Sequence, residues 1–403
     1  MTLDTSQPAT TTIDTLRSVI EPLATLERGA GSEGEREAAK HLQEMFQRAG
    51  VTAQVEEEWF HPGYAKLLLP LGVIGVAAGL AASKGRRRPL LGLLSALATY
   101  VLIDDVENGR RTYRKAITKA QKTWNVVAQA GDADAKKTFV VLAHHDAAPT
   151  GAIFDQSGQR WIAENHPQLI ERTDTGFPFW WAAAAGTGLS ALGALTGRRL
   201  FARLGAMFAG LNVGLGLDIG RDRIVPGAND NLSGVGVLVA LAERLREEPV
   251  SGVRVLLASC GAEEVLQGGI YGFVDRHLKP LDPENVYVLN LDTVGCPQLI
   301  MIEGEGPFVM HDFDPAWRDQ VASAAERATG EPLRRGPRAR ASSDSIVPSR
   351  AGYRTAMLGS WEPASKAISN YHLPTDTPDR LNYATIARAV DVAEALVREL
   401  ASR

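Results

Sequence analysis

Short apolar runs typical of buried strands alternate along this chain with segments of helical periodicity, and this alternation limits the possible folds more than any other feature. The strand-like runs are NVVAQA, KTFVVLAH, GVRVLLASC and NVYVLNLD, with the length and composition expected of strands. Between two of them, SGVGVLVALAERLREE places Leu238, Leu241 and Leu245 on one helical face. Strands that alternate with helices predict an α/β sandwich around a largely parallel sheet.

A second amphipathic helix is predicted near the N-terminus, in GSEGEREAAKHLQEMFQRAG. Ser32 and Glu35 have the spacing of a capping box, in which each side chain accepts a hydrogen bond from the other residue's N–H. Leu42 and Phe46 fall on one face, and Gly50 ends the pattern. The alternating run VTAQVEEEW that follows predicts a further strand.

Two regions do not fit a water-soluble α/β domain, because each holds a pair of long apolar runs. LLLPLGVIGVAAGLAAS and PLLGLLSALATYVLI are separated by KGRRR, and FPFWWAAAAGTGLSALGALT and LFARLGAMFAGLNVGLGL by two arginines. As helices, the runs would extend roughly 26, 22, 30 and 27 Å, against about 30 Å for the hydrocarbon core of a bilayer. We therefore expect two helical hairpins with basic tips, at residues 64–104 and 177–218.

These hairpins favour association with a membrane. Small residues such as Gly72, Gly75 and Gly205 allow close helix contact, and Trp180 and Trp181 suit a lipid interface. We expect an integral cell-membrane protein in contact with membrane lipid. A soluble helical lid or an oligomerisation module is the alternative. The side of the membrane and the oligomeric state stay open, since basic residues also flank the end of the first hairpin opposite its tip.

Charge and cysteine content exclude other classes of protein. The net charge of −4 is spread over mixed signs, so the basic footprint of a nucleic-acid-binding protein is missing. Cys260 and Cys296 lie inside apolar runs, which predicts buried free thiols rather than a disulfide framework or a thiolate zinc site. The glycines of GANDNLSG do not have the G-x-G-x-x-G spacing of a dinucleotide-binding loop.

Histidines and carboxylates recur where the predicted strands end, which is where open α/β sheets place their binding crevice. In order, these residues are His144, His145, Asp146, Asp230, Glu263, Glu264, Asp292 and His372. The His-x-Asp spacing puts the first histidine and Asp146 on one side of an extended segment and His145 on the other. Taken singly, each residue has a simpler interpretation, such as a helix N-cap, a turn residue or a solvated helix start.

Taken together, the motifs HHD, GANDNLSG, EE, NLD and YH resemble, in this order, those of the co-catalytic zinc aminopeptidases, peptidase family 28. This family includes bacterial leucyl aminopeptidases and, more distantly, glutamate carboxypeptidases and glutaminyl cyclases. The resemblance covers about residues 13–60 and 123–400 and neither hairpin. It implies a three-layer zinc exopeptidase fold with a central mixed, largely parallel sheet, made of residues 1–63, 105–176 and 219–403.

The resemblance also implies a role for each residue. His144, Asp230 and Asp292 would hold one Zn²⁺, and Asp230, Glu264 and His372 a second, so that Asp230 bridges the two ions. Asp146 would orient His144, and Glu263 would be the general base that takes a proton from a metal-bridging water. The mixed nitrogen and oxygen ligands suit zinc but also accept Mn²⁺ or Co²⁺.

The expected function is therefore that of a metallo-exopeptidase, an aminopeptidase that acts on peptides or small amides. A carboxypeptidase, glutaminyl cyclase-like acyl transfer or a non-catalytic membrane receptor are the alternatives. The chain departs from the family pattern in two places. A long insertion separates Asp146 from Asp230, and Ser343-Asp344-Ser345 stands where the family has Ser-Asp-His.

Overall fold

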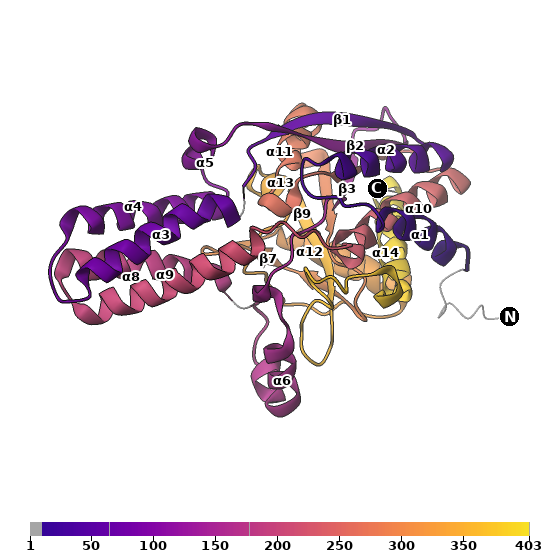
Figure 1. Cartoon of the computed structure of the whole chain (residues 1–403). Helices are drawn as coiled ribbons and strands as arrows, with labels where there is room; N and C mark the ends of the chain where they lie inside the picture. Colours follow the sequence, from indigo (N-terminus) through magenta and orange to yellow (C-terminus); the bar gives the residue numbers. More distant parts are fainter. Residues whose placement is uncertain (1–9, 64, 177, 403) are drawn as a thin grey trace.

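The computed structural model describes residues 10–63, 65–176 and 178–402. Its centre is a seven-stranded sheet with the order β1-β2-β4-β3-β5-β9-β6 (Figure 1). The strands are β1 Thr52–Phe60, β2 Gln121–Gly131, β3 Thr138–His144, β4 Arg254–Cys260, β5 Val286–Leu291, β6 Gln298–Ile302 and β9 Arg354–Trp361. Strands β4, β3, β5 and β9 are parallel, whereas β2 and β6 pair antiparallel to their neighbours. The predicted mixed, largely parallel sheet is thus confirmed.

The side chains of β3 alternate between two apolar cores, which shows that the sheet is covered on both faces. Phe139 and Val141 belong to the larger core, with helices α1 Thr10–Leu23, α2 Glu33–Arg48, α10 Ser233–Glu247, α12 Pro315–Thr329 and α14 Tyr383–Ser402. Val140 and Leu142 belong to the smaller core, with α11 Gly269–Phe273. This is the expected three-layer sandwich, and Cys260 and Cys296 are free and buried within it, as predicted.

The capping-box prediction was half right. Ser32 accepts a hydrogen bond from the backbone N–H of Glu35 at 3.1 Å. The carboxylate of Glu35 does not return to Ser32. It accepts instead from the backbone N–H groups of Gly31 and Ala262 at 2.9 and 2.7 Å. The N-terminus of α2 is therefore tied to the loop after β4.

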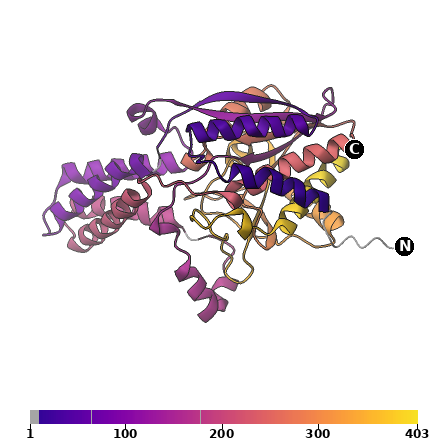
Figure 2. The same ribbon diagram turned by 45° about the vertical axis from the view of Figure 1, so that its right-hand side comes forward.

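The four apolar runs form the two predicted helical hairpins, which pack together as a bundle that projects from the sandwich (Figures 1 and 2). Its helices are α3 Ala65–Ala82, α4 Pro89–Val106, α8 Phe179–Thr196 and α9 Arg199–Ile219. Among the described residues, α3, α4 and α9 are long and apolar enough to cross a membrane. Helix α8 is of similar length but is not among them.

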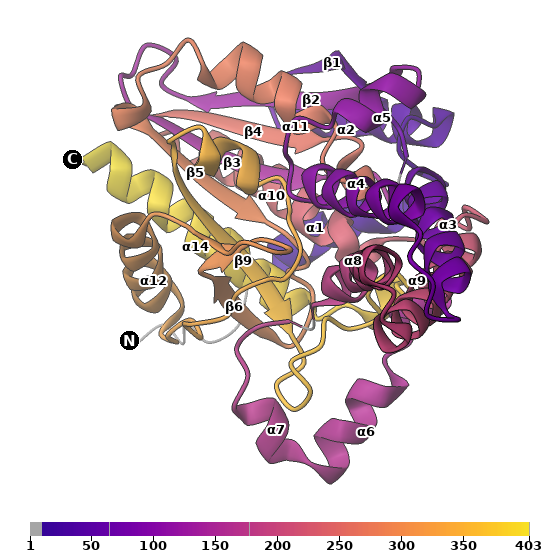
Figure 3. The same ribbon diagram turned by 90° about the vertical axis from the view of Figure 1, so that its left-hand side faces the viewer.

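The remaining helices are short. Helix α5 Thr112–Ile117 follows the first hairpin, and α13 Ile346–Arg350 precedes β9. Helices α6 Ser157–Asn165 and α7 Pro167–Glu171 form a separate projection beside the bundle (Figure 3). Strands β7 Gly304–Glu305 and β8 His311–Asp312 make a small ladder of their own.

Candidate metal centre

The sheet topology brings most of the chemically active residues to one edge. Strands β3, β4 and β5 are parallel, so their carboxyl ends meet at the same edge. His144 ends β3, the pair Glu263-Glu264 follows β4, and Asp292 follows β5. Asp230 comes from the turn before α10.

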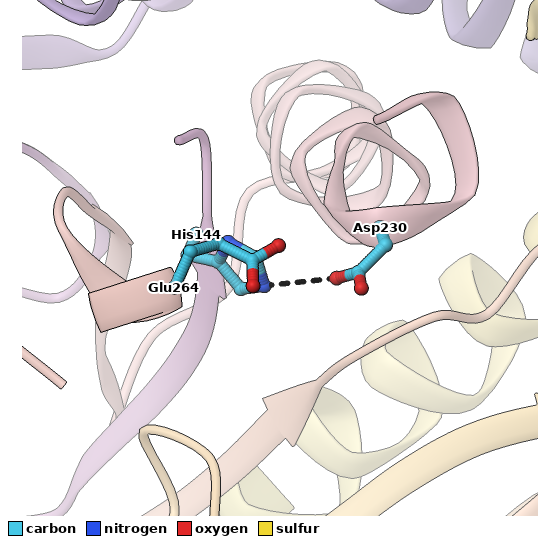
Figure 4. A group of neighbouring side chains, drawn as sticks. All are labelled: His144, Asp230 and Glu264. Carbon is cyan, nitrogen blue, oxygen red and sulfur yellow. Dashed lines mark ion pairs between the residues drawn. The ribbon is translucent and has the colours of Figure 1, made fainter. Parts of the chain in front are cut away.

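Asp230 contacts two histidines through its two carboxylate oxygens. Its Oδ1 lies 3.2 Å from Nε2 of His144, and its Oδ2 lies 3.1 Å from Nε2 of His372. Nε2 of His372 also lies 3.2 Å from Oε2 of Glu264. One ligand atom each of His144, Asp230 and Glu264 lies within 4.8 Å of the others, and Figure 4 shows the three side chains converging. An aspartate whose oxygens face different histidines has the arrangement that a bridging ligand needs.

Asp292 lies near enough to the group for the charges of Asp230, His144 and Glu264 to act on its carboxyl group. Burial and the negative charge of Asp230 raise the pKa of Asp292 to about 7. Burial lowers the pKa of His372, but Glu264 and Asp230 raise it to about 10. The pocket thus holds more carboxylate charge than its surroundings compensate, and a cation favours such a pocket.

Unpartnered atoms indicate where such a cation fits. Within the described residues, Nδ1 of His372 and Oε1 of Glu264 are buried without a hydrogen-bond partner, and Nε2 of His372 lies beside the carboxylate oxygens of Asp230 and Glu264. Buried polar atoms rarely lack a partner in folded proteins. An imidazole nitrogen and carboxylate oxygens within 4.8 Å of one another, as in His144, Asp230 and Glu264, match the ligand chemistry of zinc, so these residues fit a divalent metal.

Asp146 lies behind the cluster and supports it. Its two oxygens accept hydrogen bonds from the backbone N–H groups of Glu263 and Glu264, each at 3.0 Å. Its Oδ1 also lies 3.3 Å from Nδ1 of His144. One buried carboxylate therefore positions the imidazole of His144 and the loop after β4.

Glu263 is turned so that one oxygen is held and the other faces the cluster. Its Oε1 accepts a hydrogen bond from Nε2 of Gln267 at 2.8 Å, while Oε2 lies 4.0 Å from Nε2 of His144. Burial raises the pKa of Glu263 well above its usual range, although His144 lowers it. A carboxylate in this environment takes up a proton more readily than one in water.

His145 points away from the cluster. Its Nδ1 lies 2.9 Å from Oγ of Ser259, and burial lowers its pKa to about 4. The two adjacent histidines are thus separated by the pleat of the strand.

Several supporting residues escaped the sequence analysis. Asp376 accepts hydrogen bonds from the backbone N–H groups of Asn229 and Asp230 at 2.8 and 3.1 Å. Arg28 is fully buried and donates to the carbonyl oxygens of His145 and Pro226, each at 2.8 Å. Asp376 stands four residues after His372, so the motif around His372 could have pointed to it. Arg28 and Gln267 offered none, because neither belongs to a recognisable pattern.

The Ser343-Asp344-Ser345 segment lies beside the cluster. Both carboxylate oxygens of Asp344 are buried without a hydrogen-bond partner in the part of the chain that the structure describes. Burial raises the pKa of this carboxyl group to about 8. Oγ of Ser345 accepts a hydrogen bond from Ser343 at 3.0 Å. The side chain of Ser345, at the position where the family has a histidine, therefore joins a buried network of hydroxyl groups.

Comparison with known proteins agrees with this arrangement. The model of peptidase family M28 matches residues 215–397. None of the curated proteins matches the chain in sequence.

Solved structures match along nearly the whole chain. A glutaminyl cyclase from Bacteroides thetaiotaomicron, bound to N-acetylhistamine, has a TM-score of 0.58 and 13% identity, covering 96% of this chain and 97% of its own. An aminopeptidase from Aneurinibacillus sp. has a TM-score of 0.56 and 15% identity, covering 98% and 95%. A Zn-dependent exopeptidase from Parabacteroides distasonis has a TM-score of 0.55 and 12% identity, covering 97% and 98%. At these identities, the likeness establishes the zinc exopeptidase fold.

Proposed function

We propose that this chain, whose residues 215–397 match the model of peptidase family M28, is a zinc aminopeptidase that removes N-terminal residues from peptides. One observation carries the proposal. Glu263 lies beside the convergent group His144, Asp230 and Glu264, and its Oε2 accepts no described hydrogen bond and lies 4.0 Å from Nε2 of His144. A metal site with an adjacent unliganded carboxylate has the parts that amide hydrolysis requires.

Zinc is the metal that the residues and the relatives support together. His144, Asp230 and Asp292 would hold one ion, and Asp230, Glu264 and His372 a second. Bound zinc would polarise the scissile carbonyl group and lower the pKa of water toward 7. Two ions are part of the proposal, because Asp230 offers a separate oxygen to each histidine.

Glu263 would transfer the proton. The hydrogen bond from Gln267 fixes Oε1, which leaves Oε2, 4.0 Å from Nε2 of His144, to accept a proton from the attacking water. The protonated carboxyl group then donates to the nitrogen of the departing amine. Because burial raises the pKa of Glu263, it can hold the proton between these two steps.

An aminopeptidase is the first candidate, since an aminopeptidase from Aneurinibacillus sp. is among the structural neighbours. A glutaminyl cyclase-like activity is the second candidate, since a glutaminyl cyclase is among the structural neighbours.

Metal analysis combined with a peptide-library assay tests the proposal. Wild-type protein should contain zinc and release N-terminal amino acids from peptides with a free N-terminus but not from N-acetylated ones. Glu263→Gln should retain zinc and lose activity by 10²–10⁴-fold, the usual contribution of a positioned general base. Glu326→Gln, on the exposed face of α12, is the matched control and should behave as wild type.

Other outcomes would identify the alternatives. Ammonia release from peptides that begin with glutamine, without amino-acid release, would identify a cyclase. Zinc-loaded wild-type protein that does not differ from a blank on any peptide would refute the enzyme and leave the receptor.

We also propose that the bundle is inserted in the cell membrane. Most exposed large apolar side chains of the described chain lie on its four helices, among them Leu90, Leu97, Leu200 and Leu217. Exposed apolar surface of this extent marks a membrane or protein interface. Extraction of membranes with alkaline carbonate tests this. An inserted bundle keeps the protein in the pellet, whereas complete release to the supernatant would contradict insertion.

A further inference from the structure

The far end of the bundle carries a concentrated positive charge. The loop between α3 and α4 meets the turn between α8 and α9, since the backbone N–H of Arg88 donates to the carbonyl of Ala194 at 2.7 Å. The two hairpin tips therefore form one surface, at the end of the bundle away from the sheet (Figure 1). We call this surface the basic tip; its exposed cations are Lys84, Arg86, Arg87, Arg88, Arg198, Arg199 and Arg203.

The sequence of the bundle offers no acidic residue near these cations. The stretches 65–103 and 176–217, which hold nearly all of the bundle, contain no aspartate or glutamate. Seven like charges on one small surface repel one another, and an anionic partner relieves that repulsion. The composition of the basic tip suits the anionic headgroups of phospholipids, which attract Lys and Arg side chains near the membrane surface.

The walls of the bundle show how the basic tip reaches those headgroups. Charged residues of the four helices lie near their ends, as Lys66 and Asp105 do at the sheet end and Arg203 does one turn from the tip. Helices α3 and α4 have 18 residues each. Each therefore extends about 27 Å, close to the thickness of the hydrocarbon core. The side chain of Arg203 is long enough to reach the headgroup region from its position. The bundle is therefore suited to cross a bilayer with the basic tip emerging on the far side.

Two basic residues at the sheet end of the bundle, Arg111 and Arg114, have a structural role instead, whereas others there, such as Arg110 and Arg221, are exposed. Arg114 is buried and forms a bidentate ion pair with Asp105, with distances of 2.9 and 2.7 Å. Arg111 is buried as well and donates to the carbonyl oxygen of Asp105 at 3.2 Å. These two arginines hold α5 against the end of α4 and are withdrawn from any lipid surface.

The lengths of the loops indicate how the bundle is oriented in the membrane. Basic residues set membrane topology when they stand in short loops, whereas segments longer than about 60 residues are translocated largely regardless of charge. The two tips are short loops, whereas residues 107–178 form the long connection on the domain side. The rule that positive loops stay in the cytoplasm therefore applies to the tips.

We infer that the basic tip lies on the cytoplasmic side of the membrane, in contact with anionic headgroups of that leaflet, and that the peptidase domain stands on the extracytoplasmic side. This inference rests on the membrane insertion and peptidase activity proposed above. It implies that the substrates are peptides outside the cytoplasm.

The site would lie on the membrane-facing side of that domain. Helix α9 ends at Ile219, and the chain reaches Asp230 eleven residues later. Oδ2 of Asp218, in the last turn of α9, accepts a hydrogen bond from the backbone N–H of Ala152 at 2.7 Å, in the loop that follows Asp146. The base of the bundle is thus bonded directly to a loop that leads to the metal cluster.

Variants with one introduced cysteine test on which side of the membrane the peptidase domain and the basic tip lie. Cys260 and Cys296 are buried, so an introduced thiol supplies the accessible signal. Ser157→Cys places it on α6 of the peptidase domain and Thr196→Cys places it at the basic tip, both at exposed positions. In a host bacterium with a single membrane, a membrane-impermeant maleimide should label Ser157→Cys in intact cells and Thr196→Cys only after permeabilisation.

The contrary outcomes are distinct. Equal labelling of both variants in intact cells, or labelling of Thr196→Cys alone, would overturn the inferred topology. Release of the protein by alkaline carbonate would instead contradict the membrane insertion on which the topology rests. Failure of the peptide assay would contradict only the proposed peptidase activity.

A charge variant tests the cause of the orientation. Arg86→Gln, Arg87→Gln, Arg88→Gln and Arg198→Gln, combined with Thr196→Cys, should raise the labelled fraction in intact cells from near zero to about half, because the charge difference that fixes topology is lost. The matched control combines Arg221→Gln and Arg223→Gln, two exposed arginines at the sheet end of α9, and should leave labelling unchanged. Uniform orientation in the tip variant would contradict the role of the basic tip.

Discussion

At the scale of single residues, the centre is held in place by carboxylates that do not face it. Asp146 binds the backbone after β4, and Asp376 binds the backbone of the turn that carries Asp230. Both act through backbone N–H groups, so they fix the position of a ligand without competing for the metal. Groups that orient metal ligands commonly change metal affinity by 10–100-fold when removed.

Asp376→Asn tests this role. An amide presents one oxygen where the carboxylate offered two, so one of the N–H groups of Asn229 and Asp230 loses its acceptor. We expect zinc affinity to fall by about 10–100-fold. Competition with a chelating dye measures it, and Asp379→Asn, an exposed neighbour, is the control. Affinity within twofold of wild type for Asp376→Asn would show that the turn holds its shape without this carboxylate.

The sequence allowed the prediction of only part of this centre. His144, Asp230, Glu263, Glu264, Asp292 and His372 stand beside apolar runs or in short motifs, so their order along the chain was informative. Gln267 and Arg28 act through contacts with residues far away in sequence or through loop conformation, as when Arg28 reaches the carbonyl oxygen of His145. Such contacts leave no periodic pattern, so only the folded chain reveals them.

At the scale of elements, the bundle is packed through glycines. A Cβ atom on Gly205 of α9 would lie 2.3 Å from the backbone nitrogen of Ser190 in α8, whereas one on Gly210 of the same helix would meet nothing within 4 Å. Hydrogen bonds add to this packing, as Oγ of Ser95 donates to the carbonyl of Thr187 at 2.7 Å. Small residues and interhelical hydrogen bonds are the means by which helices associate in lipid.

Gly205→Val and Gly210→Val form a matched pair, because both put the same β-branched residue into α9. Overpacking a close interface costs about 1–3 kcal/mol or more, so the first variant should lower the thermal midpoint of the detergent-solubilised protein and the second should lower it much less. Equal midpoints for the two variants would mean that α8 and α9 do not pack this closely.

The elements also show which predictions were easy. The apolar runs of β2 to β5 and the hairpins carry strong patterns over their whole length, and their predicted positions agree with the structure. Strands β6 and β9 were not predicted, because QLIMI and RTAMLGSW are short apolar runs that periodicity cannot distinguish from buried helix. Their place in the sheet depends on mutual pairing across intervening chain.

At the scale of the whole molecule, the fold places a charged pocket at the base of an apolar bundle. The sandwich alone accounts for the positions of His144, Glu263 and Asp292, since parallel strands bring them to one edge. Asp230 is different, because the chain reaches it from α9. Insertion of the second hairpin between Asp146 and Asp230 therefore leaves the cluster intact while joining it to the bundle.

Metal binding by the intact protein should release protons. Without metal, Glu264 and Asp230 raise the pKa of His372 to about 10, so its imidazole is protonated at pH 7, and Asp292, with a pKa of about 7, is partly protonated. A metal ligand must be deprotonated. Zinc therefore displaces these protons, and its affinity should increase about tenfold per pH unit for each proton displaced, until the pH reaches the pKa of that group.

Calorimetric titration of zinc in buffers of different ionisation enthalpy counts the protons released. At pH 7 we expect more than one per protein. His372→Asn should release about one fewer, because the imidazolium is gone while Asp292 remains, and His145→Asn should match wild type, since burial lowers the pKa of His145 to about 4 and keeps it neutral. Binding heats that do not depend on the buffer would mean that His372 is already neutral, and its place between Asp230 and Glu264 would then need another explanation.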